Sequence, residues 1–170
     1  MKVSTSIDET LTVRRPAPHD AAAIHQLVVD SETLEANSGY AYLLVCSHFA
    51  ATSLIAEEDD ELLGFVTGYR PPSHPASVFV WQIGIAAHAR GRGLASVLLD
   101  ELVALPACDG VQYLEATVTP SNVPSRKLFL GFARRHGAPC RIAEGFTADE
   151  FPEARHESEQ LYQIGPLPDQ

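Results

Sequence analysis

The chain has 170 residues, which suits one domain and is short for two. Its 12 basic and 22 acidic side chains give a formal charge of −10, which argues against a surface that neutralises the phosphates of nucleic acid or anionic lipid. Hydrophobic residues make up 45% of the chain and charged residues 20%, as in folded globular proteins. We expect one domain over residues 1–170. The charge suits a small or cationic partner, although solubility alone would also explain it.

The lengths of the apolar runs and the spacing of the cysteines predict the cellular compartment and whether the protein binds a metal. No apolar run approaches the ~20 residues of a membrane span, and the first residues lack the apolar stretch of a signal peptide. The three cysteines, Cys46, Cys108 and Cys140, are scattered and never spaced as C-x-x-C. This pattern indicates reduced thiols in a cytosol rather than disulfides or zinc ligands. We therefore expect a cytoplasmic protein that binds no metal, membrane or nucleic acid.

The first half of the chain predicts a strand and two helices, followed by a hairpin. Residues 1–11 are expected to be a flexible polar tail. Asp20 is expected to cap the first helix, whose apolar face would carry Ala23, Ile24, Leu27 and Val28. An acidic turn at 58–61 separates the two hairpin strands. In chain order the expected elements are a strand at 12–15, helices at 20–31 and 40–50, and strands at 52–57 and 62–69.

The second half alternates strands with helices. After a stiff proline loop at 71–75, the expected elements are a strand at 78–85, a helix at 96–103, a strand at 111–118, a helix at 122–130 and a last strand at 159–164. The chain from Phe132 to this last strand is expected to be irregular. The order βααβββαβα with a β-rich tail predicts an α/β fold, a mixed central sheet with helices on both faces.

A glycine-rich segment, Arg90-x-x-Gly93-x-Ala95, lies between a predicted strand and a predicted helix. Glycines let the backbone turn tightly and approach a ligand with no Cβ in the way. The first turn of the following helix offers N–H groups and the positive end of the helix dipole, so the segment favours a pyrophosphate site. Neither a Walker A loop nor a G-x-G-x-x-G fingerprint is present. A surface turn with two solvated arginines would show the same pattern.

The same segment resembles the acetyl-coenzyme A loop of the GNAT acetyltransferase superfamily, whose pattern is Q/R-x-x-G-x-G/A. The order of elements also resembles that fold over nearly the whole chain. The resemblance implies that the strand before the loop splays from its neighbour and that the backbones of Ile83 and Ile85 hold the pantetheine and polarise the acetyl carbonyl. Asn122 matches an asparagine that often contacts coenzyme A. The residues implied to hold the pyrophosphate are Arg90, Gly91, Arg92, Gly93, Leu94, Ala95 and Ser96.

One position departs from the superfamily pattern. Many relatives carry a tyrosine seven residues after that asparagine, as the general acid for the leaving thiolate. Here the position is Phe129, which has no proton to give. Either another group protonates the thiolate, or a thiolate with an ordinary pKa of ~8.5 leaves with little help.

A narrower resemblance rests on several separated segments: LEANSGYAYLL (34–44), CSHFA (46–50), GYRPP (68–72), FVWQ (79–82), TVTPSN (117–122) and the closing residues 156–166. Together they resemble the L-2,4-diaminobutyrate acetyltransferases, which acetylate their substrate in ectoine synthesis, an osmoadaptation pathway. The resemblance implies direct transfer, in a ternary complex, of the acetyl group of acetyl-coenzyme A to the γ-amine of L-2,4-diaminobutyrate. It also implies a homodimer.

The acceptor amine determines which groups the site needs. A lysine-like amine with a pKa of ~10.4 is protonated at pH 7, and removing that proton costs about 4.6 kcal/mol. The site must hold the ammonium with carboxylates or aromatic faces and then take its proton. The resemblance implies two sets of such residues. The catalytic set is Glu159, His156 and Trp81, and the substrate-binding set is Glu35, Tyr40, Trp81, Thr117 and Glu159.

Each of these residues also has a structural interpretation. Glu35, where the family has an aspartate, is equally a solvated carboxylate, whereas aromatic residues in apolar segments, such as Tyr40 and Trp81, are usually core residues. His156 and Glu159 would equally suit a charged edge strand that resists aggregation. Alternation along the strand predicts that Trp81 shares a face with Ile83 and Ile85. In an extended segment His156 and Glu159 would point to opposite faces, so they meet only if the chain bends.

Three further residues, Asn37, Cys46 and His48, carry expectations. Asn37 is expected to be a helix cap. Cys46 and His48 lie two apart on one predicted helix and do not face one another, which excludes a Cys–His nucleophile.

Two alternative functions remain open. The acceptor could be another small amine, such as a polyamine or an aminoglycoside, because aromatic residues and glutamates alone do not select among amines. A non-catalytic acyl-coenzyme A sensor is the other alternative, prompted by Phe129 in place of the usual acid.

Overall fold

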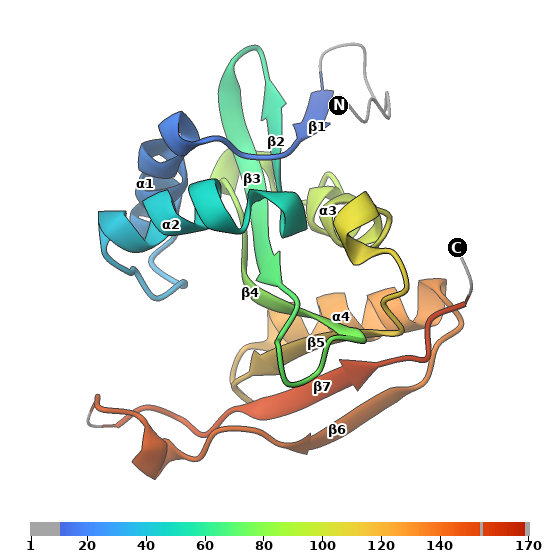
Figure 1. The fold of residues 1–170 in the computed structure, drawn as a ribbon. Helices are drawn as coiled ribbons and strands as arrows, with labels where there is room; N and C mark the ends of the chain where they lie inside the picture. The colour runs from blue at the N-terminus through green and yellow to red at the C-terminus, as the bar shows by residue number, and fades with distance from the viewer. Residues whose placement is uncertain (1–10, 154, 169–170) are drawn as a thin grey trace. The chain divides into compact units, whose positions relative to one another are not determined.

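The computed structural model describes residues 11–153 and 155–168 (Figure 1). These residues form two compact units, one of residues 11–69 and 80–109, the other of residues 70–79 and 110–168. The α-helices are α1 (Ala21–Ser31), α2 (Gly39–His48), α3 (Leu94–Val103) and α4 (Val123–Arg135). The strands are β1 (Leu11–Arg14), β2 (Ser53–Glu58), β3 (Glu61–Tyr69), β4 (Ser77–Ile85), β5 (Tyr113–Val118), β6 (Cys140–Glu144) and β7 (Gln160–Ile164).

The strands are hydrogen-bonded in the order β1-β2-β3-β4-β5-β7-β6. β4 and β5 are parallel, whereas β1–β2, β2–β3, β5–β7 and β6–β7 are antiparallel. The predicted α/β class with a mixed sheet is confirmed. The hairpin predicted around the acidic turn is confirmed as well, since Glu58 pairs with Glu61 across Asp59 and Asp60, both at positive φ.

In the first unit, helices cover both faces of the sheet. Phe65 of β3 belongs to a buried cluster with Ile24 of α1 and Tyr42 of α2. The preceding residue, Gly64, faces the other side, where a Cβ would lie 3.5 Å from a methyl carbon of Leu98 in α3. Because consecutive strand residues point to opposite faces, α1 and α2 cover one face and α3 the other.

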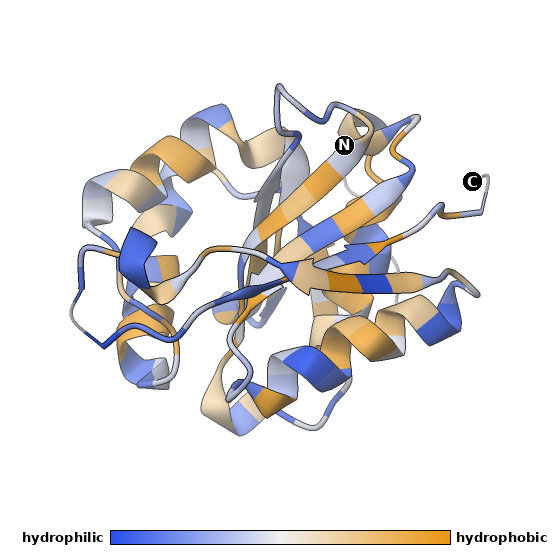
Figure 2. Ribbon diagram, turned by 90° about the horizontal axis from the view of Figure 1, so that it is seen from below, coloured by the Kyte–Doolittle hydropathy of each residue, from blue (hydrophilic) through white to orange (hydrophobic). Residues whose placement is uncertain are grey.

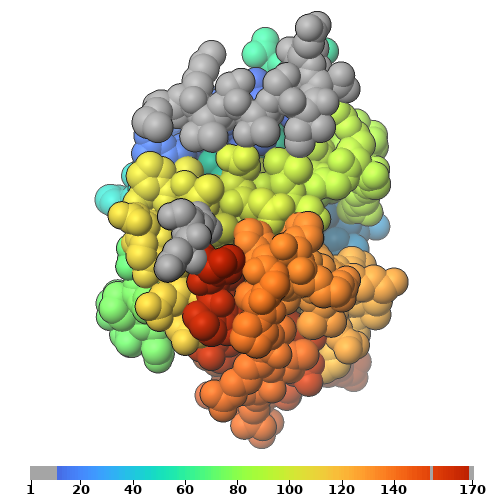
Figure 3. Space-filling view, turned by 90° about the vertical axis from the view of Figure 1, so that its right-hand side faces the viewer, coloured from blue at the N-terminus to red at the C-terminus, as the bar shows by residue number. Residues whose placement is uncertain are grey.

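In the second unit, α4 packs on β7. Its buried face includes Phe129 and Phe132, and the Phe129 ring centroid lies 6.4 Å from that of Tyr162 in β7. In the space-filling view, orange residues of this unit lie beside the red C-terminal segment (Figure 3). Hydrophilic and hydrophobic residues lie on different sides of the helices (Figure 2). The parallel register of β4 and β5 runs from the pair Ser77↔Tyr113 to the pair Phe79↔Glu115.

Three details of the first half differ from the sequence prediction. The first strand starts at Leu11, which is buried, whereas residues 1–10 of the expected tail lie outside the described residues. A 3₁₀ turn, Pro18–Asp20, precedes α1, so the helix begins at Ala21. The buried face of α1 includes Ala21 and not Ala23, which is exposed. The side chain of Asp20 makes no cap bond to α1, because Ala17 and Arg14 donate to its carboxylate instead.

Helix ends and one strand also differ. Ser38, not Asn37, caps α2, because its hydroxyl accepts from the Ala41 amide at 3.3 Å. The fourth helix runs to Arg135 rather than ending at Leu130, since burial of Phe132 and Ala133 continues its apolar face. The segment expected to be irregular contains β6, whose exposed residues and weak alternation gave no strand signal.

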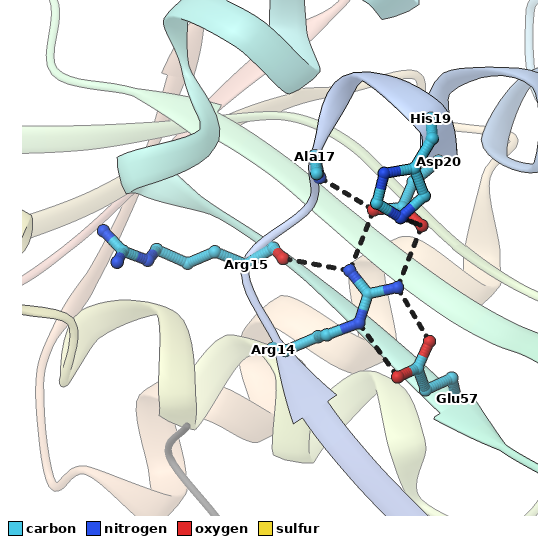
Figure 4. A network of polar contacts seen from close by, with 6 residues as sticks. All are labelled: Arg14, Arg15, Ala17, His19, Asp20 and Glu57. Atoms are coloured by element: carbon cyan, nitrogen blue, oxygen red, sulfur yellow. Dashed lines mark hydrogen bonds and ion pairs between the residues drawn. The ribbon is translucent and has the colours of Figure 1, made fainter. Parts of the chain in front are cut away.

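Arg14 ties β1 to β2 and to the turn before α1 (Figure 4). Its guanidinium donates to both oxygens of Asp20 at 2.8 and 2.9 Å and to both oxygens of Glu57 at 2.9 Å. Burial raises the pKa of Asp20, but the hydrogen bonds from Arg14 and Ala17 outweigh it, so the pKa lies below its ordinary value. The stabilisation from this carboxylate is therefore present above the unfolded pKa of ~3.9 and is lost as pH falls through the folded pKa.

Replacing Arg14 with Met is expected to lower the free energy of unfolding at pH 7 by about 1–3 kcal/mol, because two partly buried carboxylates lose their partner. The difference from the wild type should shrink on acidification, as Asp20 becomes protonated. Arg15→Met, the same charge change at an exposed neighbour, is the control and should cost little. Urea denaturation across pH 3–7 measures both. An equal loss of unfolding free energy in the two variants would contradict the stabilising role of Arg14. So would a difference between Arg14→Met and the wild type that does not change with pH.

Candidate active site

The glycine-rich turn before α3 has the geometry expected of an anion-binding loop. Gly91 and Gly93 have φ values of 80° and 77°, in the left-handed region that favours glycine. Both are exposed, and a Cβ at either position would meet no atom within 4 Å. Gly93 immediately precedes α3, so the space beside it adjoins the N–H groups and positive dipole end of that helix. The predicted turn is confirmed, and it leaves room for a phosphate group.

The two arginines of this loop are held differently. The two terminal nitrogens of Arg92 donate to the two oxygens of Glu58, at the end of β2, at 3.1 and 2.8 Å. Arg90 is exposed, and its Nε donates to the carbonyl of Ile85 at 3.4 Å. Arg92 is thus anchored to the hairpin turn, whereas Arg90 lies over the end of β4.

Trp81, Ile83 and Ile85 are half-buried along β4. The ring of Trp81 lies 6.0 Å from that of Tyr42 in α2, and Trp81 packs against the cluster beneath α1 and α2. The side chain of Ile85 instead covers Gly64. The two residues therefore have different packing partners in the first unit.

A chain of buried hydrogen bonds supports the segment that carries Glu35. The hydroxyl of Tyr42 donates to Oε1 of Gln82 at 2.9 Å, and Nε2 of Gln82 donates to the carbonyl of Glu35 at 2.8 Å. The backbone of Glu35 is thereby fixed, while the residue itself stays exposed. Sequence reasoning missed Tyr42 and Gln82, because a polar residue in an apolar helix or strand does not reveal its partner. Tyr40 is 68% exposed, which excludes its interpretation as a core residue.

In the second unit, the end of the β6–β7 hairpin brings His156 and Glu159 together. Nε2 of His156 lies 3.9 Å from Oε1 of Glu159, and the two side chains are only 18% and 20% exposed. Arg155, the residue before His156, has a φ of 78°, in the left-handed region. Phe151 stacks on the imidazole at 3.6 Å between centroids. The two side chains therefore lie together, although their spacing would place them on opposite faces of a straight extended strand.

β5 and the start of α4 carry the remaining candidates. Thr117 is half-buried on β5, where it pairs with Leu161 of β7. Asn122 caps α4, since its side-chain oxygen accepts from the Ser125 amide at 3.1 Å. The cap uses the oxygen, so the carboxamide NH₂ is the group through which Asn122 would contact a ligand.

Two side chains are unsuited to catalysis. Phe129 is 3% exposed and packs on Tyr162, so the position offers no proton. Burial raises the pKa of the Cys46 thiol to about 11, which keeps it protonated and unreactive. This agrees with the exclusion of a Cys–His nucleophile.

The structure describes residues 11–153 and 155–168. In that part of the chain, no group of three or more His, Cys, Asp or Glu side chains could hold a metal ion. Within the same residues no helix has the length and apolar character needed to span a bilayer.

The family model described as "Acetyltransferase (GNAT) family" matches residues 21–132. An L-2,4-diaminobutyric acid acetyltransferase of Halalkalibacterium halodurans is 46% identical over 162 residues, which are 95% of this chain and 85% of the relative. One of Marinococcus halophilus is 44% identical over 94% of this chain and 92% of the relative. The chain belongs to the L-2,4-diaminobutyric acid acetyltransferases of the GNAT family.

A solved structure extends the comparison to three dimensions. The diaminobutyrate acetyltransferase EctA from Paenibacillus lautus, in complex with L-2,4-diaminobutyric acid and coenzyme A, matches with a TM-score of 0.89 and 38% identity. The match covers 94% of this chain and 97% of the other. The predicted fold and family are therefore confirmed.

Tyr42→Phe is expected to lower the free energy of unfolding by about 1–3 kcal/mol, because Oε1 of buried Gln82 loses its donor. Tyr40→Phe, the same change two residues earlier on α2 at an exposed site, should leave stability unchanged. Chemical denaturation of the two variants compares them directly. A similar cost for both would mean that the bond from Tyr42 to Gln82 contributes nothing.

Proposed function

We propose that the protein transfers the acetyl group of acetyl-coenzyme A to the γ-amine of L-2,4-diaminobutyrate and releases N-γ-acetyl-L-2,4-diaminobutyrate and coenzyme A. The observation that carries the proposal is the likeness to the Paenibacillus lautus enzyme, which is named for this substrate and was solved with it and with coenzyme A. That likeness covers nearly the whole of both chains, at 38% identity.

Acetyl-coenzyme A is assigned to the turn before α3. Its pyrophosphate would accept hydrogen bonds from the backbone of residues 90–96, where two glycines at positive φ leave open space. The exposed Arg90 adds a positive charge there. In this proposal the backbones of Ile83 and Ile85 hold the pantetheine, and Asn122 contributes its carboxamide NH₂.

The acceptor ammonium is assigned to His156 and Glu159. Two acceptor atoms 3.9 Å apart are close enough for one nitrogen to donate a hydrogen bond to each. Glu159 supplies the negative charge that holds the ammonium, and a neutral His156 takes its proton. Trp81, Tyr40, Glu35 and Thr117 complete the assignment as substrate contacts.

The reaction then needs no covalent enzyme intermediate. The neutral amine attacks the thioester carbonyl carbon, a C–N bond forms, and the C–S bond breaks. Coenzyme A leaves as a thiolate, and the second proton of the amine is released as the amide forms. The buried thiol of Cys46, with its raised pKa, does not compete as a nucleophile.

The assembly and location are part of the proposal. We infer a homodimer in the cytoplasm, on the basis of the resemblance and the scattered cysteines described above. Light scattering on the purified protein tests the subunit number, and a monomeric mass at working concentration would contradict the dimer.

The function is tested by thiol release from acetyl-coenzyme A with L-2,4-diaminobutyrate, ornithine, lysine and spermidine in parallel, with the product mapped by NMR. We expect a strong preference for diaminobutyrate and acetylation of its γ-nitrogen. Turnover of spermidine would retain the family and overturn the substrate. Tight coenzyme A binding with no turnover of any amine would favour the sensor alternative.

Gly93→Ala is expected to weaken coenzyme A binding at least about tenfold, because a Cβ would occupy the space beside the α3 N-terminus and the positive φ would be strained. Gly110→Ala is the matched control, since its φ of 72° is equally left-handed and a Cβ there also meets nothing within 4 Å. Both variants should lose similar stability, but only Gly93→Ala should lose affinity by titration calorimetry. Equal affinity in the two variants would remove the phosphate site from this turn.

A further inference from the structure

We propose that Glu157 is a positioning residue that fixes His156 in one tautomer, with the proton on Nδ1 and the lone pair of Nε2 directed toward Glu159. The kinetic consequence rests on the function proposed above, whereas the tautomer itself does not. Glu157 was not among the residues that the sequence assigned to the site.

The tautomer follows from one hydrogen bond. Nδ1 of His156 lies 2.6 Å from the backbone carbonyl of Glu157. A carbonyl oxygen only accepts, so Nδ1 carries the proton. In the neutral ring Nε2 is then an acceptor, and it is the nitrogen that faces Oε1 of Glu159 at 3.9 Å.

The other tautomer would have a different chemistry. With its proton on Nε2, His156 would donate to Glu159 and could not take a proton from an ammonium group placed between them. With its proton on Nδ1, both Nε2 and Oε1 accept, so the pair binds a donor and Nε2 can remove a proton from it. The carbonyl of Glu157 therefore decides whether His156 acts as a base.

The side chain of Glu157 holds that carbonyl in place. Its two carboxylate oxygens accept from the backbone N–H of Ser121 at 3.2 Å and from the Ser121 hydroxyl at 2.5 Å. Ser121 immediately precedes Asn122, the cap of α4, so the hairpin end is tied to the start of a helix. A charged acceptor with two donors is a stronger anchor than a neutral one.

A second contact fixes the plane of the imidazole. Phe151 stacks on it with an interplanar angle of 13°. Stacking restricts the tilt of the ring but is indifferent to which nitrogen carries the proton. The tautomer thus depends on the Glu157 carbonyl, and the orientation depends on both contacts.

The test is ¹⁵N NMR of histidine-labelled protein without substrate, with His156→Gln to assign the signal, at about pH 9, where an imidazole of ordinary pKa is neutral. We expect Nδ1 to be protonated in the wild type and a mixture of tautomers in Glu157→Ala. Ser121→Ala, which removes only a hydroxyl, should shift the mixture part-way. Glu157→Gln keeps an acceptor for Ser121 and should restore the wild-type signal, and Glu153→Ala, an exposed glutamate of the same hairpin, should not change it.

The kinetic arm uses the same variants with diaminobutyrate. Glu157→Ala should lower kcat/KM for the amine by about tenfold to a hundredfold while calorimetric affinity for coenzyme A stays unchanged. An unaltered tautomer in both Glu157→Ala and Ser121→Ala would overturn the proposal, as would equal losses for amine and coenzyme A. If the tautomer changes as expected but the wild type does not acetylate diaminobutyrate, the proposed function fails and the positioning role stands.

Discussion

The first unit depends on the absence of side chains at Gly64 and Gly84. A Cβ on Gly64 would lie 2.5 Å from Cδ1 of Ile85 and 3.0 Å from the Gly84 carbonyl, and one on Gly84 would lie 2.8 Å from Leu34 and Phe65. A Cβ at 2.5 or 2.8 Å from another carbon would force a neighbour to move, and one at 3.0 Å from a carbonyl oxygen would be tight, so glycine at both positions lets β3, β4 and the segment after α1 pack closely. Leu34 adjoins Glu35, and Ile85 ends the strand that leads to the anion-binding turn. Close packing at Gly64 and Gly84 thus helps to position the segment that carries Glu35 and the end of β4 before the glycine-rich turn.

Local signals in the sequence were sufficient for most of the fold. The hydrophobic period identified the strands and helices up to α4, and Gly91 and Gly93 marked a turn that requires positive φ. The errors have physical causes. The cap of α2 moved by one residue because either Asn37 or Ser38 supplies a suitable oxygen. β6 was missed because it has exposed Arg141 and Ile142 side by side, so no alternation distinguished it from a loop.

Contacts between distant residues could not be predicted in the same way. The bond from Gln82 to the Glu35 carbonyl joins residues 47 positions apart, and the carboxylate of Glu157 reaches Ser121 across 36. Nothing in either local pattern requires the partner. His156 and Glu159 were identified through resemblance alone, since their spacing in an extended segment places them on opposite faces. In the structure they nonetheless lie within 3.9 Å of each other, and Phe151 stacks on the imidazole of His156.

The phenylalanine at position 129 bears on whether the site needs a general acid at all. Its ring is buried against Tyr162, whose hydroxyl accepts a hydrogen bond from Nε of Arg126 at 3.2 Å. The position is thus occupied by a packed aromatic ring that carries no ionisable group. A thiolate whose thiol has an ordinary pKa of ~8.5 is a weaker base than an amine whose ammonium has a pKa of ~10.4, so the thiolate is the better leaving group and departs without a proton. The more difficult proton transfer is the removal of a proton from the ammonium, and that is the step for which His156 is proposed as the base. Phe129 therefore removes a group that the reaction does not require, and it gives no reason to prefer a non-catalytic role.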